Sequence, residues 1–191
     1  MTAATAAASV RGGEVTPDLL GRAKAGDQQA FTEIVRHYDH RLRALAYRLL
    51  GDRGGMDDAL QEAYVKAFRA LPAFREDAAL GTWLYQITYR ACVDHQRREG
   101  RHRPDDASGP EPAATGASAD PAGTAAARTD LARALAALPV DQRAAVLLVD
   151  AQGLDYDAAA AVLGVAPGTI ASRLSRARAA LRATLAEGET R

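Results

Sequence analysis

Apolar residues recur at intervals of three and four through the first half of this chain, and this spacing predicts helices rather than strands. The longest run lies between Asp27, a suitable N-terminal cap, and Gly51, a suitable stop. Its apolar positions are Phe31, Ile34, Tyr38, Leu42, Leu45 and Leu49. Shorter helices are expected at 17–26 after the cap Thr16, at 58–71 after Asp57, and from about Thr82 to 98.

The second half continues with shorter helices separated by proline and glycine. One is expected at 131–138, capped by Thr129 or Asp130 and ended by Pro139, and another at 142–152, capped by Asp141 and ended by Gly153. Helices at 156–163 and 167–181 flank a three-residue turn, which is the layout of a helix-turn-helix. The expected fold class is all-α, with two small helical domains at 16–100 and 129–186.

The last of these helices carries arginine and no acid from 169 to 182. With 100° per residue, Ile170, Leu174, Ala177 and Leu181 share one narrow face, which would pack on the preceding helix. The opposite face holds Ser172, Ser175, Arg176 and Ala179, flanked by Arg173 on one side and by Arg178 and Arg182 on the other. In a major groove, the serines and Arg176 would meet base edges and the flanking arginines phosphates. A solvated basic helix on an ordinary bundle is the alternative.

Between the two halves, residues 101–128 contain no Leu, Ile, Val, Met or aromatic residue but four of the eight prolines. Such a segment buries too little apolar surface to offset the entropy of ordering it, so a flexible linker is expected there. Residues 1–15 are similarly poor in apolar residues, and a disordered tail is expected.

The charge, the cysteine content and the lack of long apolar runs restrict the classes of protein to which this chain can belong. The 24 basic and 24 acidic residues cancel, so a DNA-binding protein of this composition must segregate its positive charge, as the arginine-rich stretches 86–103 and 169–182 do. Cys92 is the single cysteine, which excludes an internal disulfide and a multi-cysteine zinc site. No apolar run has the length of a membrane span and no signal peptide is apparent, so a cytoplasmic protein without membrane insertion is expected.

Enzymatic chemistry has little support in the sequence. The four histidines, His37, His40, His95 and His102, have no partners at metal-ligand spacing, and no glycine-rich phosphate loop follows a strand. We therefore expect no catalytic residue, no metal or other cofactor, and no small-molecule substrate.

Four segments together resemble the extracytoplasmic-function sigma factors, the two-domain initiation subunits of bacterial RNA polymerase. They are DDALQEAY at 57–64, GTWLYQI at 81–87, LPVDQR at 138–143 and the helix-turn-helix at 153–181. The resemblance implies a transcription initiation factor that binds core RNA polymerase, reads the −35 promoter element and melts the −10 element. It also implies an anti-sigma factor as a partner, and association with the nucleoid when the chain is bound to polymerase.

The resemblance assigns roles to three groups of residues. Asp58, Gln61 and Glu62 are assigned to docking on a basic coiled coil of the polymerase. The alternative is that Asp57 and Asp58 complement the dipole at the start of a helix. The −35 contacts fall to Thr169, Ser172, Arg173, Ser175, Arg176 and Arg178. Aromatic and cationic side chains bind unstacked bases. The residues assigned to melting of the −10 element are accordingly Phe74, Trp83, Tyr85, Tyr89, Arg90, Arg97 and Arg98. For Trp83 a core position is the alternative.

Two positions depart from the family pattern. Arg90 stands where relatives often have the asparagine tied to capture of a flipped base, and Ala171 stands where they often have a basic residue. Both departures leave the base preference open. The competing hypothesis is a stand-alone helix-turn-helix repressor or activator whose first domain senses a ligand or dimerises.

Overall fold

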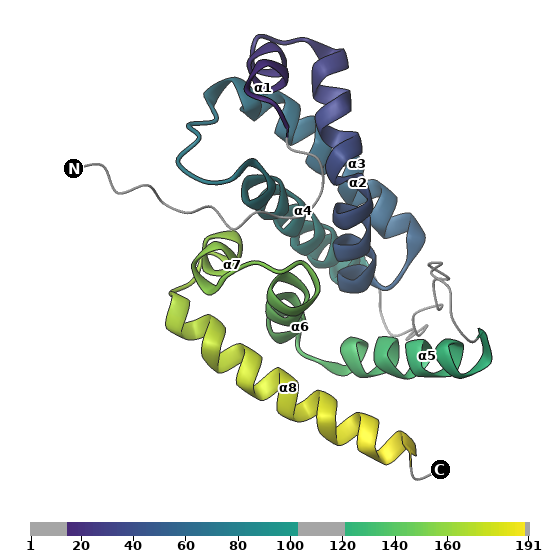
Figure 1. Ribbon diagram of the computed structural model, residues 1–191. Helices are drawn as coiled ribbons and strands as arrows, with labels where there is room; N and C mark the ends of the chain where they lie inside the picture. Colours follow the sequence, from purple (N-terminus) through teal and green to yellow (C-terminus); the bar gives the residue numbers. More distant parts are fainter. Residues whose placement is uncertain (1–14, 103–120, 190–191) are drawn as a thin grey trace.

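The computed structural model describes residues 15–102 and 121–189, and all regular structure in these two ranges is helical (Figure 1). The all-α fold class is therefore confirmed. The expected tail, apart from Val15, and the central part of the expected linker, 103–120, lie outside the described residues.

The first domain consists of four α-helices and one short 3₁₀ turn. They are α1 (Pro17–Lys24), α2 (Gln28–Leu50), α3 (Arg53–Ala70), η1 (Leu71–Ala73) and α4 (Leu80–His102). Helices α2, α3 and α4 pack on one another, and α1 lies across the start of α2 (Figure 1). Ile34, Leu42, Leu45 and Leu60 are each at most 1% exposed, so the predicted apolar spacing does mark the core.

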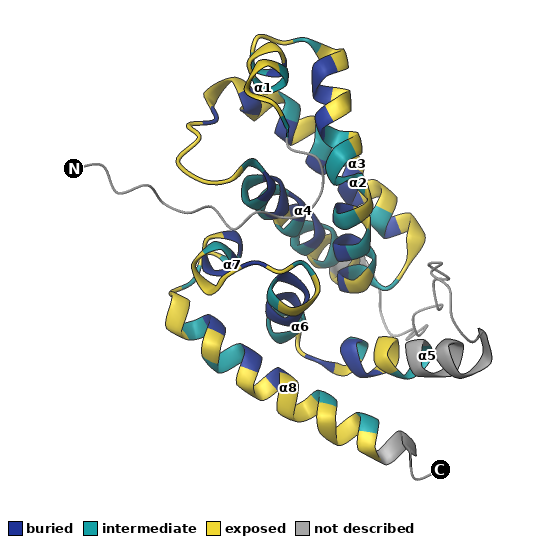
Figure 2. Cartoon of the chain, viewed as in Figure 1, coloured by how far each residue is buried: buried dark blue, intermediate teal, exposed yellow. Residues whose placement is uncertain are grey.

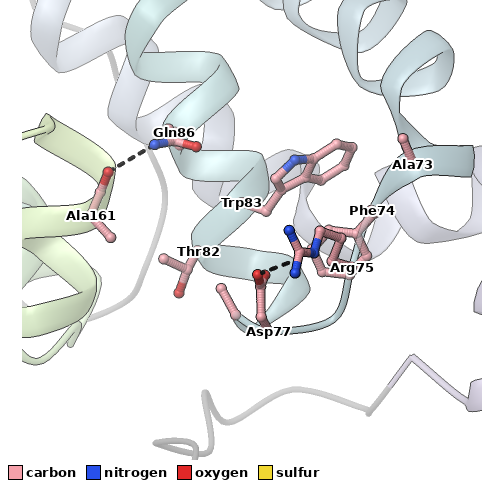
Figure 3. A pocket seen from close by; sticks show the side chains of 9 residues that line it. Ala73, Phe74, Arg75, Asp77, Thr82, Trp83, Gln86 and Ala161 are labelled. Carbon is pink, nitrogen blue, oxygen red and sulfur yellow. Dashed lines mark hydrogen bonds and ion pairs between the residues drawn. The ribbon is translucent and has the colours of Figure 1, made fainter.

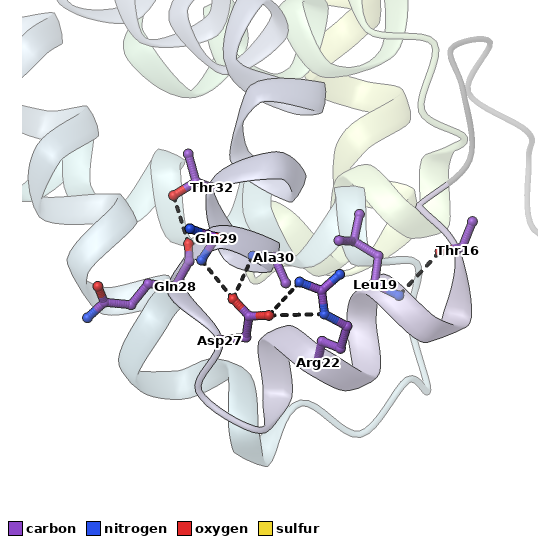
Figure 4. A network of polar contacts seen from close by, with 8 residues as sticks. All are labelled: Thr16, Leu19, Arg22, Asp27, Gln28, Gln29, Ala30 and Thr32. Carbon is purple, nitrogen blue, oxygen red and sulfur yellow. Dashed lines mark hydrogen bonds and ion pairs between the residues drawn. The ribbon is translucent and has the colours of Figure 1, made fainter.

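The N-terminal caps of α1 and α2 are those expected from the sequence (Figure 4). The Thr16 hydroxyl accepts the Leu19 amide at 3.2 Å. Asp27 Oδ1 accepts hydrogen bonds from the amides of Gln29 at 2.9 Å and Ala30 at 3.1 Å. Its other oxygen, Oδ2, accepts one from Arg22 Nη2 at 2.6 Å. These bonds satisfy amides that a helix start leaves without partners, which is why the two helices begin where they do.

The predicted start of α3 was wrong. The helix begins at Arg53, because Asp52 is extended and accepts the Gly55 amide at 2.6 Å. Position 55 is crowded, since a Cβ there would lie 2.7 Å from His95 Nε2 and 2.9 Å from Asp52 Oδ2, and these side chains would have to shift. Asp57 and Asp58 consequently lie in the second turn of α3, which removes the interpretation that they complement the dipole at a helix start.

The second domain consists of α5 (Pro121–Ala137), α6 (Val140–Val146), a π-helical turn η2 (Leu147–Ala151), α7 (Tyr156–Leu163) and α8 (Pro167–Glu189). Two predicted starts were wrong here. Helix α5 begins at Pro121, a residue that is favourable at the first helical position and is followed by alanines of high helix propensity. Helix α6 begins at Val140 after Pro139, so Asp141 is not its cap and lies in the first turn.

The two domains pack on each other along α4 and α7, with smaller contacts from α2 to α5, α6 and η2 (Figure 1). Their buried apolar side chains form one continuous cluster. Within the described ranges, no single helix is long and apolar enough to cross a membrane. Only α7 and Pro167–Ala186 of α8 taken together pass that test, and they are bent by 96°.

Candidate nucleic-acid interface

Helices α7 and α8 form the predicted helix-turn-helix. Asp155 caps α7 by accepting the Ala158 amide at 2.7 Å, and Gly164 ends α7 in the left-handed region at φ 67°. Pro167 is the first residue of α8, as expected. Ile170, Leu174 and Ala177 are at most 1% exposed and Leu181 is partly buried, so the predicted packing face is confirmed.

The opposite face of α8 points away from the rest of the molecule (Figure 2). Ser175, Arg176 and Ala179 are exposed on it. Ser172 is partly buried, and its hydroxyl donates to the Thr169 carbonyl at 2.9 Å. Ser175 and Arg176 are therefore the two polar side chains of this face that are most available to a partner.

Two of the flanking arginines, Arg173 and Arg178, are held by acids of the same domain. Arg173 donates to Asp141 at 2.7 Å and its side chain is only 19% exposed. Arg178 donates to both carboxylate oxygens of Asp150, at 2.6 and 3.1 Å, and this hydrogen bonding raises the pKa of Arg178. Both guanidinium groups are thereby oriented beside α8, and a phosphate would have to share them with a carboxylate.

Phe74 and Trp83, two of the residues assigned to melting, meet beside a cavity of about 240 Å³ (Figure 3). Their ring centroids are 5.0 Å apart. The wall of the cavity consists of Ala73, Phe74, Arg75, Asp77, Ala78, Thr82, Trp83, Gln86 and Ala161. Aromatic walls with a few polar groups are suited to holding a flat, unstacked base.

The loop that follows Phe74 is held by α1. Lys24 Nζ donates to the Phe74 carbonyl at 2.9 Å and to Glu76 Oε1 at 2.8 Å, and lies 6.0 Å from the centre of the Phe74 ring. Glu76 has a left-handed backbone at φ 59°, which is uncommon for a residue with a side chain. Lys24 thus fixes one wall of the cavity.

The other residues assigned to melting are distributed along α4. Tyr85 is 1% exposed, its hydroxyl donates to Gln152 Oε1 of η2 at 2.9 Å, and burial raises the pKa of Tyr85 to about 12. Tyr89 is partly buried, and burial raises its pKa as well. Arg90 is exposed. The structure therefore brings Phe74 and Trp83 together, whereas Tyr85 is buried and bonded to the second domain.

The basic end of α4 lies beside the residues assigned to polymerase docking. Glu62 binds Lys66 at 2.7 Å and Arg98 at 2.6 Å, and these hydrogen bonds lower the pKa of Glu62. Asp58 and Gln61 are exposed on the same helix, and Arg97 is exposed on α4. Arg97 and Arg98 thus lie with the acidic group of α3, at the opposite end of α4 from Trp83.

Sequence reasoning missed Lys24, Gln152 and Ala161, which meet the candidate residues only through tertiary packing. No local pattern marks them. Cys92 is 1% exposed on α4, and burial raises its pKa to about 12, as expected for an inert apolar thiol. No group of three or more potential metal ligands occurs among the described residues.

Comparison with known proteins identifies both domains. A family model for sigma-70 region 2 matches residues 34–102, and one for sigma-70 region 4 matches residues 128–181. The sigma factor SigM of Mycobacterium tuberculosis is 41% identical over 166 residues, covering 86% of this chain and 81% of that protein. The sigma-E factor of Escherichia coli K12 is 35% identical over 173 residues, covering 85% of this chain and 90% of that protein.

A solved structure is similar over both domains. The sigma factor RpoE of Bartonella quintana, in complex with the anti-sigma factor NepR, matches with a TM-score of 0.68 and 32% identity, over 81% of this chain and 96% of that one. The resemblance drawn from the four sequence segments agrees with both family models, the two relatives and this solved structure. The chain belongs to the extracytoplasmic-function RNA polymerase sigma factors.

Proposed function

We propose that this sigma factor binds core RNA polymerase and directs it to promoters by reading the −35 element with α8 and melting the −10 element with its first domain. The observation that carries the proposal is that one chain presents both an outward-facing arginine helix and an aromatic cavity whose two rings, Phe74 and Trp83, belong to the other domain. RNA synthesis is the chemistry of the polymerase, so no catalytic residue is assigned to this chain. In this role the protein works in the cytoplasm, on the nucleoid.

For the −35 element, Arg176 is suited to a bidentate contact with guanine and Ser175 to a single hydrogen bond with a neighbouring base edge. Thr169 and Ser172 lie at the start of α8, where amides and hydroxyls commonly contact phosphate. Arg173 and Arg178 would bind phosphates from the two sides of the helix. Ala171 is exposed and short, which removes one cationic contact that relatives often make.

For the −10 element, the cavity beside Phe74 and Trp83 would receive a base extruded from the non-template strand. A flat apolar wall compensates for the stacking energy that the base loses, by about 1–3 kcal/mol per stacked base. Arg90 is exposed on the same helix and would bind the strand backbone. Arg97 and Arg98 would extend this contact further along the DNA.

For polymerase docking, Asp58 and Gln61 offer an exposed acceptor face on the middle of α3. Glu62 contributes while remaining paired with Lys66 and Arg98. A basic helix of the polymerase would therefore meet one carboxylate, that of Glu62, that is already oriented. An anti-sigma factor is the proposed regulatory partner, as the similar structure was solved with one.

Transcription in vitro tests this function. The chain would be added to purified core polymerase of its own organism on a library of genomic fragments, with core polymerase alone as the control. We expect RNA with defined 5′ ends only when the chain is present. Binding to specific DNA without any initiation would instead favour a stand-alone helix-turn-helix regulator.

A further inference from the structure

The cavity beside Trp83 is not formed by the first domain alone. Ala161 of α7 completes its wall, and Gln86 Nε2 of α4 donates to the Ala161 carbonyl at 2.8 Å (Figure 3). In Figure 3 this bond joins Gln86 of α4 to α7, whereas the Trp83 ring points toward Phe74 and Arg75. The helix that precedes the DNA-reading helix therefore lies against the surface proposed to receive the melted strand.

Further contacts hold the second domain in this position. The Tyr85 hydroxyl, one residue before Gln86, donates to Gln152 Oε1 at 2.9 Å, and Tyr85 is only 1% exposed. At the other end of the interface, Arg143 Nη1 donates to the Leu49 carbonyl of α2 at 3.0 Å. A surface intended for single-stranded DNA is thus covered by polar contacts from the same chain.

The covering contact is suited to being made and broken. Beside the apolar contacts between the domains, it has a few neutral hydrogen bonds and one from a guanidinium group. Each of these bonds contributes a modest net free energy because water replaces it on separation. The 18 residues between His102 and Pro121 can span at most about 60 Å, so the connection permits the domains to separate. Tethering also gives an effective concentration on the order of millimolar, so a weak interface suffices to close the molecule.

We infer that the α4 surface carrying Tyr85 and Gln86 is a docking surface for α7, and that α7 and the melted promoter strand occupy it in turn. The free sigma factor is closed by this contact. Strand entry requires α7 to leave, and polymerase, which would hold the two domains apart, favours the open form. This inference rests on the proposed role of Trp83 in strand binding.

Two fluorophores on the full-length chain can measure closure. Cysteines introduced by Glu33→Cys on α2 and Ala183→Cys on α8 are at exposed positions, and the native Cys92 is 1% exposed and would not be labelled. The DNA probe is a random-sequence single-stranded oligonucleotide. Because strand binding and closure exclude each other, saturating oligonucleotide is expected to lower the energy transfer between the labels.

The variant Gln152→Ala removes the acceptor of the buried Tyr85 hydroxyl without changing a residue assigned to DNA. Loss of this bond is expected to shift the ratio of closed to open molecules about tenfold, and to raise the affinity for the oligonucleotide by up to that factor. Gln28→Ala, an exposed glutamine of α2, is the matched control and should bind as the parent does. Circular dichroism establishes that both variants are folded.

The inference is overturned if the oligonucleotide binds without a change in energy transfer, or if Gln152→Ala opens the molecule and leaves its affinity unchanged. Trp83→Ala separates this outcome from failure of the proposed function. If Trp83→Ala binds the oligonucleotide as tightly as the parent, the role of the cavity is wrong. In that case the inference fails because its premise, strand binding at Trp83, is wrong, even if the energy transfer shows that the molecule closes.

Discussion

Arg176 and Arg178 are two residues apart on α8 but differ in what already binds them. Arg178 is paired with Asp150 at 2.6 Å, whereas Arg176 is exposed and makes no ion pair within the described part of the chain. A guanidinium group whose donors are all free can form two parallel hydrogen bonds to a base edge. One whose donors are partly used by a carboxylate is better suited to a single contact with a phosphate. The two side chains should therefore contribute differently to promoter binding.

Arg176→Ala is expected to reduce discrimination at one upstream position by about 1–3 kcal/mol, because one bidentate base contact is lost. Arg178→Ala should weaken binding to all sequences evenly, and should lower the salt dependence by about one phosphate contact. The measurement is a titration of holoenzyme against a promoter fragment and fragments changed at single upstream positions. Equal losses on every fragment from both variants would contradict the assignment of faces on α8.

At the level of elements, the loop between η1 and α4 depends on a residue from α1. Lys24 binds both the Phe74 carbonyl and Glu76, and the Phe74 ring forms part of the cavity. The ion pair itself is exposed on the Glu76 side and contributes little stability. Its effect is expected on the position of the loop rather than on folding.

Lys24→Met is accordingly expected to slow promoter opening several-fold, because the wall of the cavity is no longer fixed when the base arrives. Binding to a closed duplex that carries only the −35 element should not change. Permanganate reactivity of thymines in the −10 region measures opening, and Arg22→Met is the matched control, since Arg22 lies on the same helix but pairs with Asp27. A normal rate of opening with Lys24→Met would show that the loop is positioned without α1.

Helices with strong local signals were predictable from the sequence. Helix α2 begins after Asp27 and ends at Gly51, and α7 begins after Asp155 and ends at Gly164. Each start is set by one capping side chain and each end by one glycine backbone angle, so both are visible in the sequence. The start of α3 was missed, since Asp57 and Asp58 resemble a helix start more than Asp52 does. The start of α5 was missed because a lack of apolar residues indicates a linker, while alanine also favours a helix.

The candidate site was predictable only in part, for the same reason. The packing face of α8 follows from helical periodicity, and Ile170, Leu174 and Ala177 are buried as expected. Tyr85 was assigned to an accessible strand-binding surface, but it is 1% exposed and its hydroxyl binds Gln152 of the second domain. The sequences of the two short domains contain no local pattern that specifies how they dock, so contacts such as Gln86 to Ala161 could come only from the structure.

In the whole molecule, Arg143 joins the two domains. Its guanidinium group donates to the carbonyls of Ala136 and Leu138 near the end of α5, and to that of Leu49 near the end of α2. Burial lowers the pKa of Arg143. The two C-terminal helix ends supply partial negative charge to this cation, one from each domain.

Arg143→Met should therefore weaken the second domain and also uncouple it from the first. Loss of hydrogen bonds from a partly buried charged group is expected to lower the free energy of unfolding by about 2 kcal/mol. Calorimetry of the full chain should show one cooperative transition for the parent and two separated transitions for the variant, because the Leu49 contact no longer links the domains. Arg133→Met is the control: this α5 side chain is 71% exposed, pairs only with Asp130 among the described residues, and should change stability by at most about 0.5 kcal/mol. If both variants unfold in a single transition near the parent temperature, Arg143 does not couple the domains, and the closed arrangement must depend on the α4–α7 contacts alone.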